Sequence, residues 1–183
     1  MTVAWLVAAL AIAVWAIVTY NRLVHLRNQV QTAWADIDVQ LTRRHALVPQ
    51  LVAAVRGYTG HERGVLEAVT ELRAQALAVS SPARLGEVES SLAQAVSRLL
   101  ALKEAYPDLQ ASDQFLQLQR DLVEVEEHLQ FARRFYNGAV RDYHTALQRI
   151  PDLVVARAGG FAEREFFQAG DDEREAVAVE IGR

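Results

Sequence analysis

Apolar or small side chains recur at alternating intervals of three and four residues between Phe115 and Ile150. A heptad spacing of this kind, held here for about five repeats, predicts one long helix that packs lengthwise against other helices. Ser112 suits the N-cap of that helix, and Pro151 ends it. The seam consists of Phe115, Leu118, Leu122, Val125, Leu129, Ala132, Tyr136, Ala139, Tyr143, Ala146 and Ile150. A helix over residues 112–150 would be about 58 Å long.

The stretch of residues 3–20, "VAWLVAALAIAVWAIVTY", contains no charged side chain. As a helix it would be about 27 Å long, close to the thickness of the hydrocarbon core of a bilayer. A cleaved signal peptide is the alternative, but it would need a basic region before the apolar stretch, and only residues 1–2 precede it. We expect an uncleaved transmembrane anchor. Arg22 and Arg27 follow it, so the positive-inside rule places the N-terminus outside and the body in the cytoplasm.

A second long apolar face lies directly after this stretch. It runs from Leu23 to Val55, and Gly57 suits the C-terminal end of a helix over about residues 21–57. No segment shows the alternation that is typical of a β-strand. The expected fold class is therefore all-α, with the transmembrane helix continuing into an antiparallel bundle of about four long helices over residues 21–151.

Two shorter helices are expected between the long ones. Thr59 and Glu62 form a T-x-x-E capping box, which predicts a helix over about residues 60–79. Ser81 followed by Pro82 predicts the start of a third helix. That helix is expected over about residues 82–106.

Charge and composition exclude several classes of function. The net charge is −4, and much of it lies in an acidic tail over residues 170–183, which we expect to be disordered. The nearly neutral remainder argues against a nucleic-acid partner. The chain has no cysteine, no Glu-x-x-His pair for a di-iron bundle, no P-loop and no nucleophile elbow. We therefore expect no catalytic residue, no metal and no cofactor, and an enzyme is the least favoured class.

Arg44 is the most informative polar residue of the bundle. Steps of seven residues from Leu23 lead to it, so it occupies a core-facing position. A buried guanidinium requires a carboxylate partner. Glu62, Asp121 or Glu126 could supply that carboxylate. Such a pair would fix the register of the helices; a binding role for Arg44 is the alternative.

The neighbours of Arg44 complete this interpretation. Arg43 and His45 are expected to flank it towards solvent, and Pro49 to kink the helix after the basic cluster. The stretch "ARRFYNGAVRDY", residues 132–143, is the corresponding Arg-rich and Tyr-rich part of the last long helix. The candidate residues for a register lock or an interaction are Trp34, Asp36, Arg43, Arg44, Arg133, Arg134 and Tyr136.

Residues 152–169 are expected to form a short amphipathic segment after Pro151. Docking of this segment onto the bundle is the favoured interpretation, and a position on the membrane surface is the alternative. Its apolar side would consist of Leu153, Val154, Phe161, Phe166 and Phe167.

Three ordered blocks of the chain resemble the LemA family of bacterial membrane proteins. The first block runs from Tyr20 to Val69, the second from Leu99 to Pro151 with "EAYPDL" and "ARRFYN", and the third is "GGFAEREFF". The sequence departs from the family pattern where His45 replaces a common acidic residue, and where Gln50 and His144 replace Asn. The resemblance implies a single span of the bacterial inner membrane and a cytoplasmic helical bundle. It implies no established catalytic activity, and one branch of the family is associated with building magnetosome membranes.

The favoured function is a non-catalytic, membrane-anchored scaffold or adaptor. Its partners would be the bilayer and either other proteins or further copies of the chain, bound through exposed helix faces. The alternative function is direct action on the bilayer, in membrane shaping or lipid remodelling.

Overall fold

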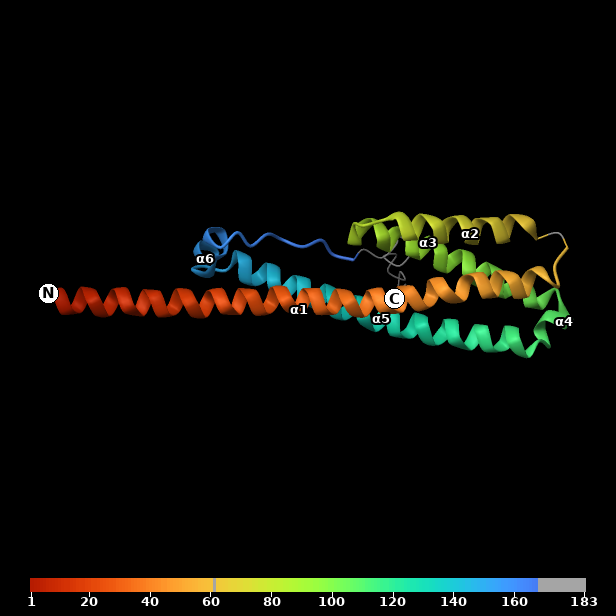
Figure 1. Cartoon of the computed structure of the whole chain (residues 1–183), viewed down its shortest axis with the longest axis horizontal. Coiled ribbons are helices and arrows are strands. Elements are labelled where there is room, and N and C mark those ends of the chain that lie inside the picture. The colour runs from red at the N-terminus through yellow and green to blue at the C-terminus, as the bar shows by residue number, and fades with distance from the viewer. Residues whose placement is uncertain (61, 168–183) are drawn as a thin grey trace, which may run out of the picture. The chain divides into compact units, whose positions relative to one another are not determined.

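The computed structural model describes residues 1–60 and 62–167 (Figure 1). These residues form helices and connecting turns, without a β-strand among them, which confirms the predicted all-α class. The longest elements are α1 (Thr2–Arg56) and α5 (Asp113–Gln148). The chain divides into two compact units. Both long helices run through the two units, so one part of α1 and one part of α5 belong to each unit.

The four-helix unit contains residues 39–130. In it, the C-terminal part of α1 and the N-terminal part of α5 pack with α2 (Arg63–Ala78) and α3 (Pro82–Ala101) around one apolar core. A 3-10 turn (Leu102–Glu104) and α4 (Pro107–Gln110) connect α3 to α5, and Leu109 of α4 is fully buried in the core. The core side chains include Val48, Leu51, Val55, Leu66, Val69, Leu92, Val96, Leu99, Phe115, Leu118 and Leu122.

The helix starts in this unit test the capping predictions. Ser81 Oγ accepts a hydrogen bond from the Arg84 backbone N–H at 3.5 Å, as the sequence predicts for the start of α3. The predicted capping box of α2 is wrong. The Thr59 hydroxyl donates instead to the carbonyl of Val55 at 3.1 Å, so it completes the end of α1, and α2 begins at Arg63 without a side-chain cap.

The other compact unit, which we call the juxtamembrane unit, contains residues 1–38 and 131–165. The N-terminal part of α1 packs there against the C-terminal part of α5. After α5 come α6 (Asp152–Ala158), a turn at residues 159–160 and a non-helical return segment, residues 161–165. Trp34 and Tyr136 are in ring contact, with centroids 5.3 Å apart. The buried side chains include Leu23, Val30, Ile37, Tyr136, Val140, Tyr143 and Leu147.

The return segment is held against α5 by hydrogen bonds at three levels. The hydroxyl of Tyr136 donates to the carbonyl of Glu165 at 2.8 Å, and the backbone N–H of Arg164 donates to Nε2 of His144 at 3.0 Å. Gln148 donates to Glu163 at 3.0 Å. Polar side chains of α5 therefore hold the return segment in place by hydrogen bonds.

Raising the pH above about 10 is expected to weaken this attachment. Burial raises the pKa of Tyr136 above its ordinary value of 10.0, and Arg164 opposes that effect. Because the folded pKa exceeds the unfolded one, the stabilising contribution is complete below the unfolded pKa and is lost as the pH rises through the folded pKa. Tyr136→Phe should lose about 1 kcal/mol at neutral pH. It should also show a shallower alkaline decline in the free energy of unfolding, measured by denaturant titration with circular dichroism.

An equal alkaline decline in the wild type and in Tyr136→Phe would contradict this assignment. Tyr143, whose pKa is also raised by burial, should retain part of the alkaline decline in the variant. The tyrosinate absorbance of the two proteins measures the ionisation of Tyr136 directly.

The apolar N-terminal stretch has a different environment from the rest of α1. All side chains of residues 1–14 are exposed, including large apolar ones such as Trp5 and Leu10. Within the part of the chain that the structure describes, α1 is the one helix whose length and composition suit a membrane span.

Candidate functional site

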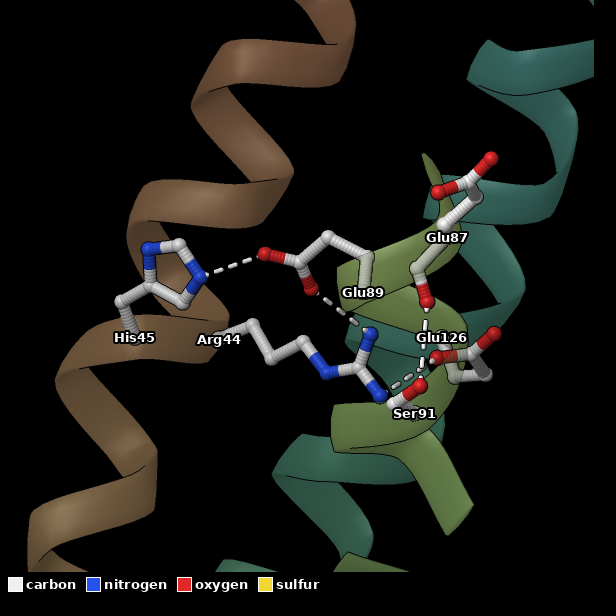
Figure 2. A network of polar contacts seen from close by, with 6 residues as sticks. All are labelled: Arg44, His45, Glu87, Glu89, Ser91 and Glu126. Atoms are coloured by element: carbon white, nitrogen blue, oxygen red, sulfur yellow. Dashed lines mark hydrogen bonds and ion pairs between the residues drawn. The ribbon is translucent and has the colours of Figure 1, made fainter. Parts of the chain in front are cut away.

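The core of the four-helix unit contains a network of charged side chains from three helices (Figure 2). Arg44 of α1 donates from Nη1 to Oε2 of Glu89 of α3 at 3.1 Å. Its other terminal nitrogen lies 3.5 Å from Oε2 of Glu126 of α5. His45 Nε2 lies 2.6 Å from the second carboxylate oxygen of Glu89. The two carboxylate oxygens of Glu89 thus contact two different side chains of α1, and Arg44 connects α3 to α5.

Burial makes this network energetically important. The side chains of Arg44 and Glu89 are 4% and 0% exposed, whereas that of Glu126 is 33% exposed. Removing charges from water costs several kcal/mol for each ion, and good geometry is needed to offset that cost. Here each carboxylate oxygen of Glu89 lies within hydrogen-bond distance of a side-chain nitrogen of α1, which is the geometry that offsets this cost.

The sequence identified Arg44 and one of its two partners. Glu126 is confirmed as a partner. The other two candidates are not partners of Arg44: Glu62 lies 3.5 Å from the hydroxyl of Tyr106, and Asp121 accepts a hydrogen bond from Gln117 at 2.7 Å. Glu89 was missed. The available signal was its spacing, because Glu89 lies four residues after Leu85 and three before Leu92, on the apolar face of its helix.

The prediction that His45 points to solvent is wrong. His45 is 8% exposed, because α1 is packed on more than one side in this unit.

The backbone carbonyl of His45 also has an unusual partner. In a regular helix this carbonyl would accept from the N–H of residue 49, but Pro49 has none. Nε of Arg73 from α2 donates to it instead, at 2.8 Å, and α1 continues past Pro49 to Arg56.

Arg43 points to solvent as predicted. Its side chain is 47% exposed and lies 3.5 Å from Glu124 of α5. Asp36 is exposed, and Trp34 contacts Tyr136 in the juxtamembrane unit. These residues therefore do not form one site with the Arg44 network.

The Arg-rich and Tyr-rich stretch of α5 is divided between core and surface. Arg133 and Tyr136 are buried, at 9% and 3% exposure. Arg134 points outward, and its guanidinium lies 4.7 Å from the ring centroid of Phe131. Phe131 and Phe135 are 65% and 51% exposed, and the sequence reasoning missed them. Both lie off the heptad seam, which is the signal that marks them as surface residues.

The five apolar residues predicted for the C-terminal segment do not share one face. Phe161 lies 5.4 Å from the ring of Tyr20 and is partly buried, and Phe167 is 2% exposed. Leu153 is half-buried, whereas Val154 and Phe166 are exposed. The helical part ends at Ala158, so the single amphipathic segment that the sequence predicted is wrong.

The surroundings of the buried network consist of ion pairs and an adjoining groove. Among residues 1–60 and 62–167, no group of three or more His, Asp or Glu side chains is placed to hold a metal ion. A groove of about 180 Å³ lies beside Arg44 and Glu126, lined mainly by apolar side chains such as Val96, Leu100 and Leu122. The two charged residues that line it, Arg44 and Glu126, are already paired with each other, which favours a role in helix alignment.

Comparison with known proteins finds similar sequences among magnetosome proteins and LemA proteins. Two magnetosome proteins, MamQ 1 and MamQ 2 of Paramagnetospirillum magneticum, are 23% identical over 83% of this chain. The matched region spans 66% of the length of each of them. Protein LemA of Metamycoplasma hominis is 25% identical, with 84% of this chain and 71% of the relative covered. The model of the LemA family matches residues 33–181, so the match includes the buried network, the C-terminal part of α1 and all of α5. The chain belongs to the LemA family.

Proposed function

We propose that the protein is a non-catalytic scaffold or adaptor, anchored by α1 in the bacterial cytoplasmic membrane. The apolar stretch of residues 3–20, exposed throughout residues 3–14, supports the anchor, since such a surface is unfavourable in water. Arg22 and Arg27 support a body in the cytoplasm and an external N-terminus. The buried network supports a well-packed four-helix unit, which suits a protein that presents surfaces to partners.

The observation that carries the proposal is an exposed aromatic surface on α5. Phe131 and Phe135 are separated by four residues and therefore lie on the same side of the helix. Arg134 lies next to them and covers part of Phe131. Aromatic and arginine side chains are enriched at the centres of protein interfaces, where they contribute most of the binding energy. We call these three residues the Phe131–Phe135 face.

The partner is another protein or a further copy of the chain. Two phenylalanine rings and a guanidinium suit an apolar helix face with an acidic rim. A self-associating scaffold would form a uniform complex of defined mass, whereas an adaptor would retain a foreign protein in fixed proportion.

Disrupting the Phe131–Phe135 face is expected to dissociate the native complex. The full-length protein is extracted in mild detergent, and the mass of the complex is measured together with the proteins that co-purify. The protein mass of the wild-type complex, without the bound detergent, should exceed the 20.4 kDa of one chain. The double variant Phe131→Ser/Phe135→Ser should weaken association at least about thirtyfold, since truncating a hot-spot residue costs about 2 kcal/mol or more.

The matched control replaces two exposed apolar residues elsewhere. Val39 and Leu77 are 56% and 59% exposed, so Val39→Ser/Leu77→Ser removes apolar surface from α1 and α2 without touching the Phe131–Phe135 face. Its complex should keep the wild-type mass. A wild-type protein that is monomeric and retains no partner would contradict the scaffold proposal, and so would equal losses in both double variants.

A further inference from the structure

The start of α6 lies beside α1 immediately after the apolar stretch. Nη1 of Arg22 donates to Oδ2 of Asp152 at 3.3 Å, and the rings of Tyr20 and Phe161 are 5.4 Å apart. In Figure 1, α6 lies next to α1, and α5 extends from it away from the N-terminus. Because α1 is continuous, Arg22 is only about 3 Å further along the axis than Tyr20. When residues 3–20 fill the hydrocarbon core, α6 is therefore at the level of the membrane surface.

The contacts between α6 and α1 fix how α6 is oriented there. Asp152 is 7% exposed, and its carboxylate is held by Arg22. Phe161, after α6, contacts Tyr20 on one side and has the guanidinium of Arg27 5.4 Å from its ring centroid. Both ends of α6 are thus attached to α1, and the remaining face is directed away from the protein.

The exposed side chains of α6 and of the turn before it, residues 149–151, include both aliphatic and basic residues. Ile150 and Val154 are 82% and 67% exposed, more than most aliphatic residues of the body. Arg149 and Arg157 are also exposed, and no described acidic side chain forms an ion pair with either of them. We call Arg149, Ile150, Val154 and Arg157 the α6 surface. Aliphatic side chains bordered by arginines are typical of segments that lie in the interfacial layer of a bilayer.

We infer that the α6 surface is a second membrane contact, which binds the anionic headgroups of the lipid around the anchor. Ile150 and Val154 enter the interfacial layer, and Arg149 and Arg157 bind lipid phosphates. Basic residues near an anionic surface each strengthen binding by about fivefold. The contact fixes the depth and rotation of α1 in the membrane, and it does not depend on any protein partner of the Phe131–Phe135 face.

The test measures whether Val154 is in contact with lipid in the full-length protein. The chain has no cysteine, so Val154→Cys gives a single site for a spin label. The labelled protein is reconstituted in bilayers of phosphatidylcholine alone or mixed with phosphatidylglycerol. Collisions with oxygen, which is enriched in lipid, are compared with collisions with a water-soluble nickel complex. The control label is placed at Ala35, which is exposed on α1 about 22 Å beyond Tyr20.

The α6 surface predicts a specific set of results. In the mixed bilayer, nickel collisions at residue 154 should be several-fold lower than at residue 35, and the protection should be greater than in phosphatidylcholine alone. Arg149→Gln/Arg157→Gln should remove that lipid dependence. All four substituted side chains are exposed, so the fold is retained, and an unchanged signal at residue 35 verifies it.

Two results would overturn the inference. If residue 154 is as accessible to nickel as residue 35 in both bilayers, the α6 surface faces water. If protection is equal in the two lipids, or survives the loss of both arginines, anionic headgroups are not the ligand. Neither result bears on the mass of the detergent-extracted complex, so the scaffold proposal is tested separately.

Discussion

Glu89→Ala is expected to lower the free energy of unfolding by about 3–5 kcal/mol, because it leaves the buried guanidinium of Arg44 without its main partner. Glu126 cannot replace Glu89 fully, since it is partly exposed and lies 3.5 Å from the opposite terminal nitrogen. His45 also loses the acceptor at 2.6 Å from its Nε2. The measurement is unfolding of the full-length protein in detergent by guanidinium chloride, monitored by circular dichroism.

A surface ion pair on the same two long helices provides the control. Glu124→Ala removes the partner of Arg43, and both of these side chains are about half exposed. Pairs of this kind contribute at most about 1 kcal/mol. Similar losses for Glu89→Ala and Glu124→Ala would show that the buried network has no special weight.

A combined apolar replacement separates stability from alignment. Arg44→Met/His45→Leu/Glu89→Leu removes the buried charges together, so it should recover most of the stability lost in Glu89→Ala. If the network fixes the register of the helices, the apolar variant should be stable but heterogeneous, with broadened amide resonances. A stable variant with one sharp set of resonances would contradict the register lock.

Deleting residues 2–14 is expected to transfer nearly all of the protein from the membrane to the soluble fraction. These side chains are all exposed, so the deletion removes apolar surface without opening the core. The α6 surface alone should not retain the chain after a high-salt wash, since a single weak contact gives only reversible membrane binding. Cell fractionation measures the transfer, and circular dichroism verifies that the helices remain.

A variant in which residues 2–14 are replaced by a different apolar sequence of the same length serves as the control and should stay in the membrane. The intact mass of the wild-type protein distinguishes an anchor from a cleaved signal peptide. A mass that includes residues 1–20 is expected. Retention of the deletion variant in washed membranes, or loss of residues 1–20 from the mature protein, would contradict the anchor.

Periodicity in the sequence predicted the helices well, because each long apolar face depends on local spacing. The heptad seam of α5 and the core position of Arg44 both follow from counting residues. The partner of Arg44 does not, since Glu89 meets it only through the rotation and register of α3 against α1. The spacing of Glu89 from Leu85 and Leu92 indicates a position on an apolar helix face. One acidic residue on such a face is compatible with several alignments of the helices.

Two of the wrong predictions, for Thr59 and His45, share a physical cause: each residue has more than one locally acceptable environment. Thr59 suits an N-cap, yet its hydroxyl reaches the Val55 carbonyl at the end of the preceding helix. His45 was assigned to the surface because it is next to a core residue, but packing on more than one side of α1 buries it as well. In both cases tertiary packing decided between local alternatives of similar energy.

Pro49 gives α1 a dependence that an ordinary helix lacks. A helical carbonyl normally finds its donor four residues further along the same helix, so a turn can form before anything docks on it. At His45 that donor comes from Arg73, 28 residues away in α2. The hydrogen-bond ladder of α1 is therefore complete at this turn only when α2 is in place, which makes local helix formation and tertiary assembly a single cooperative event.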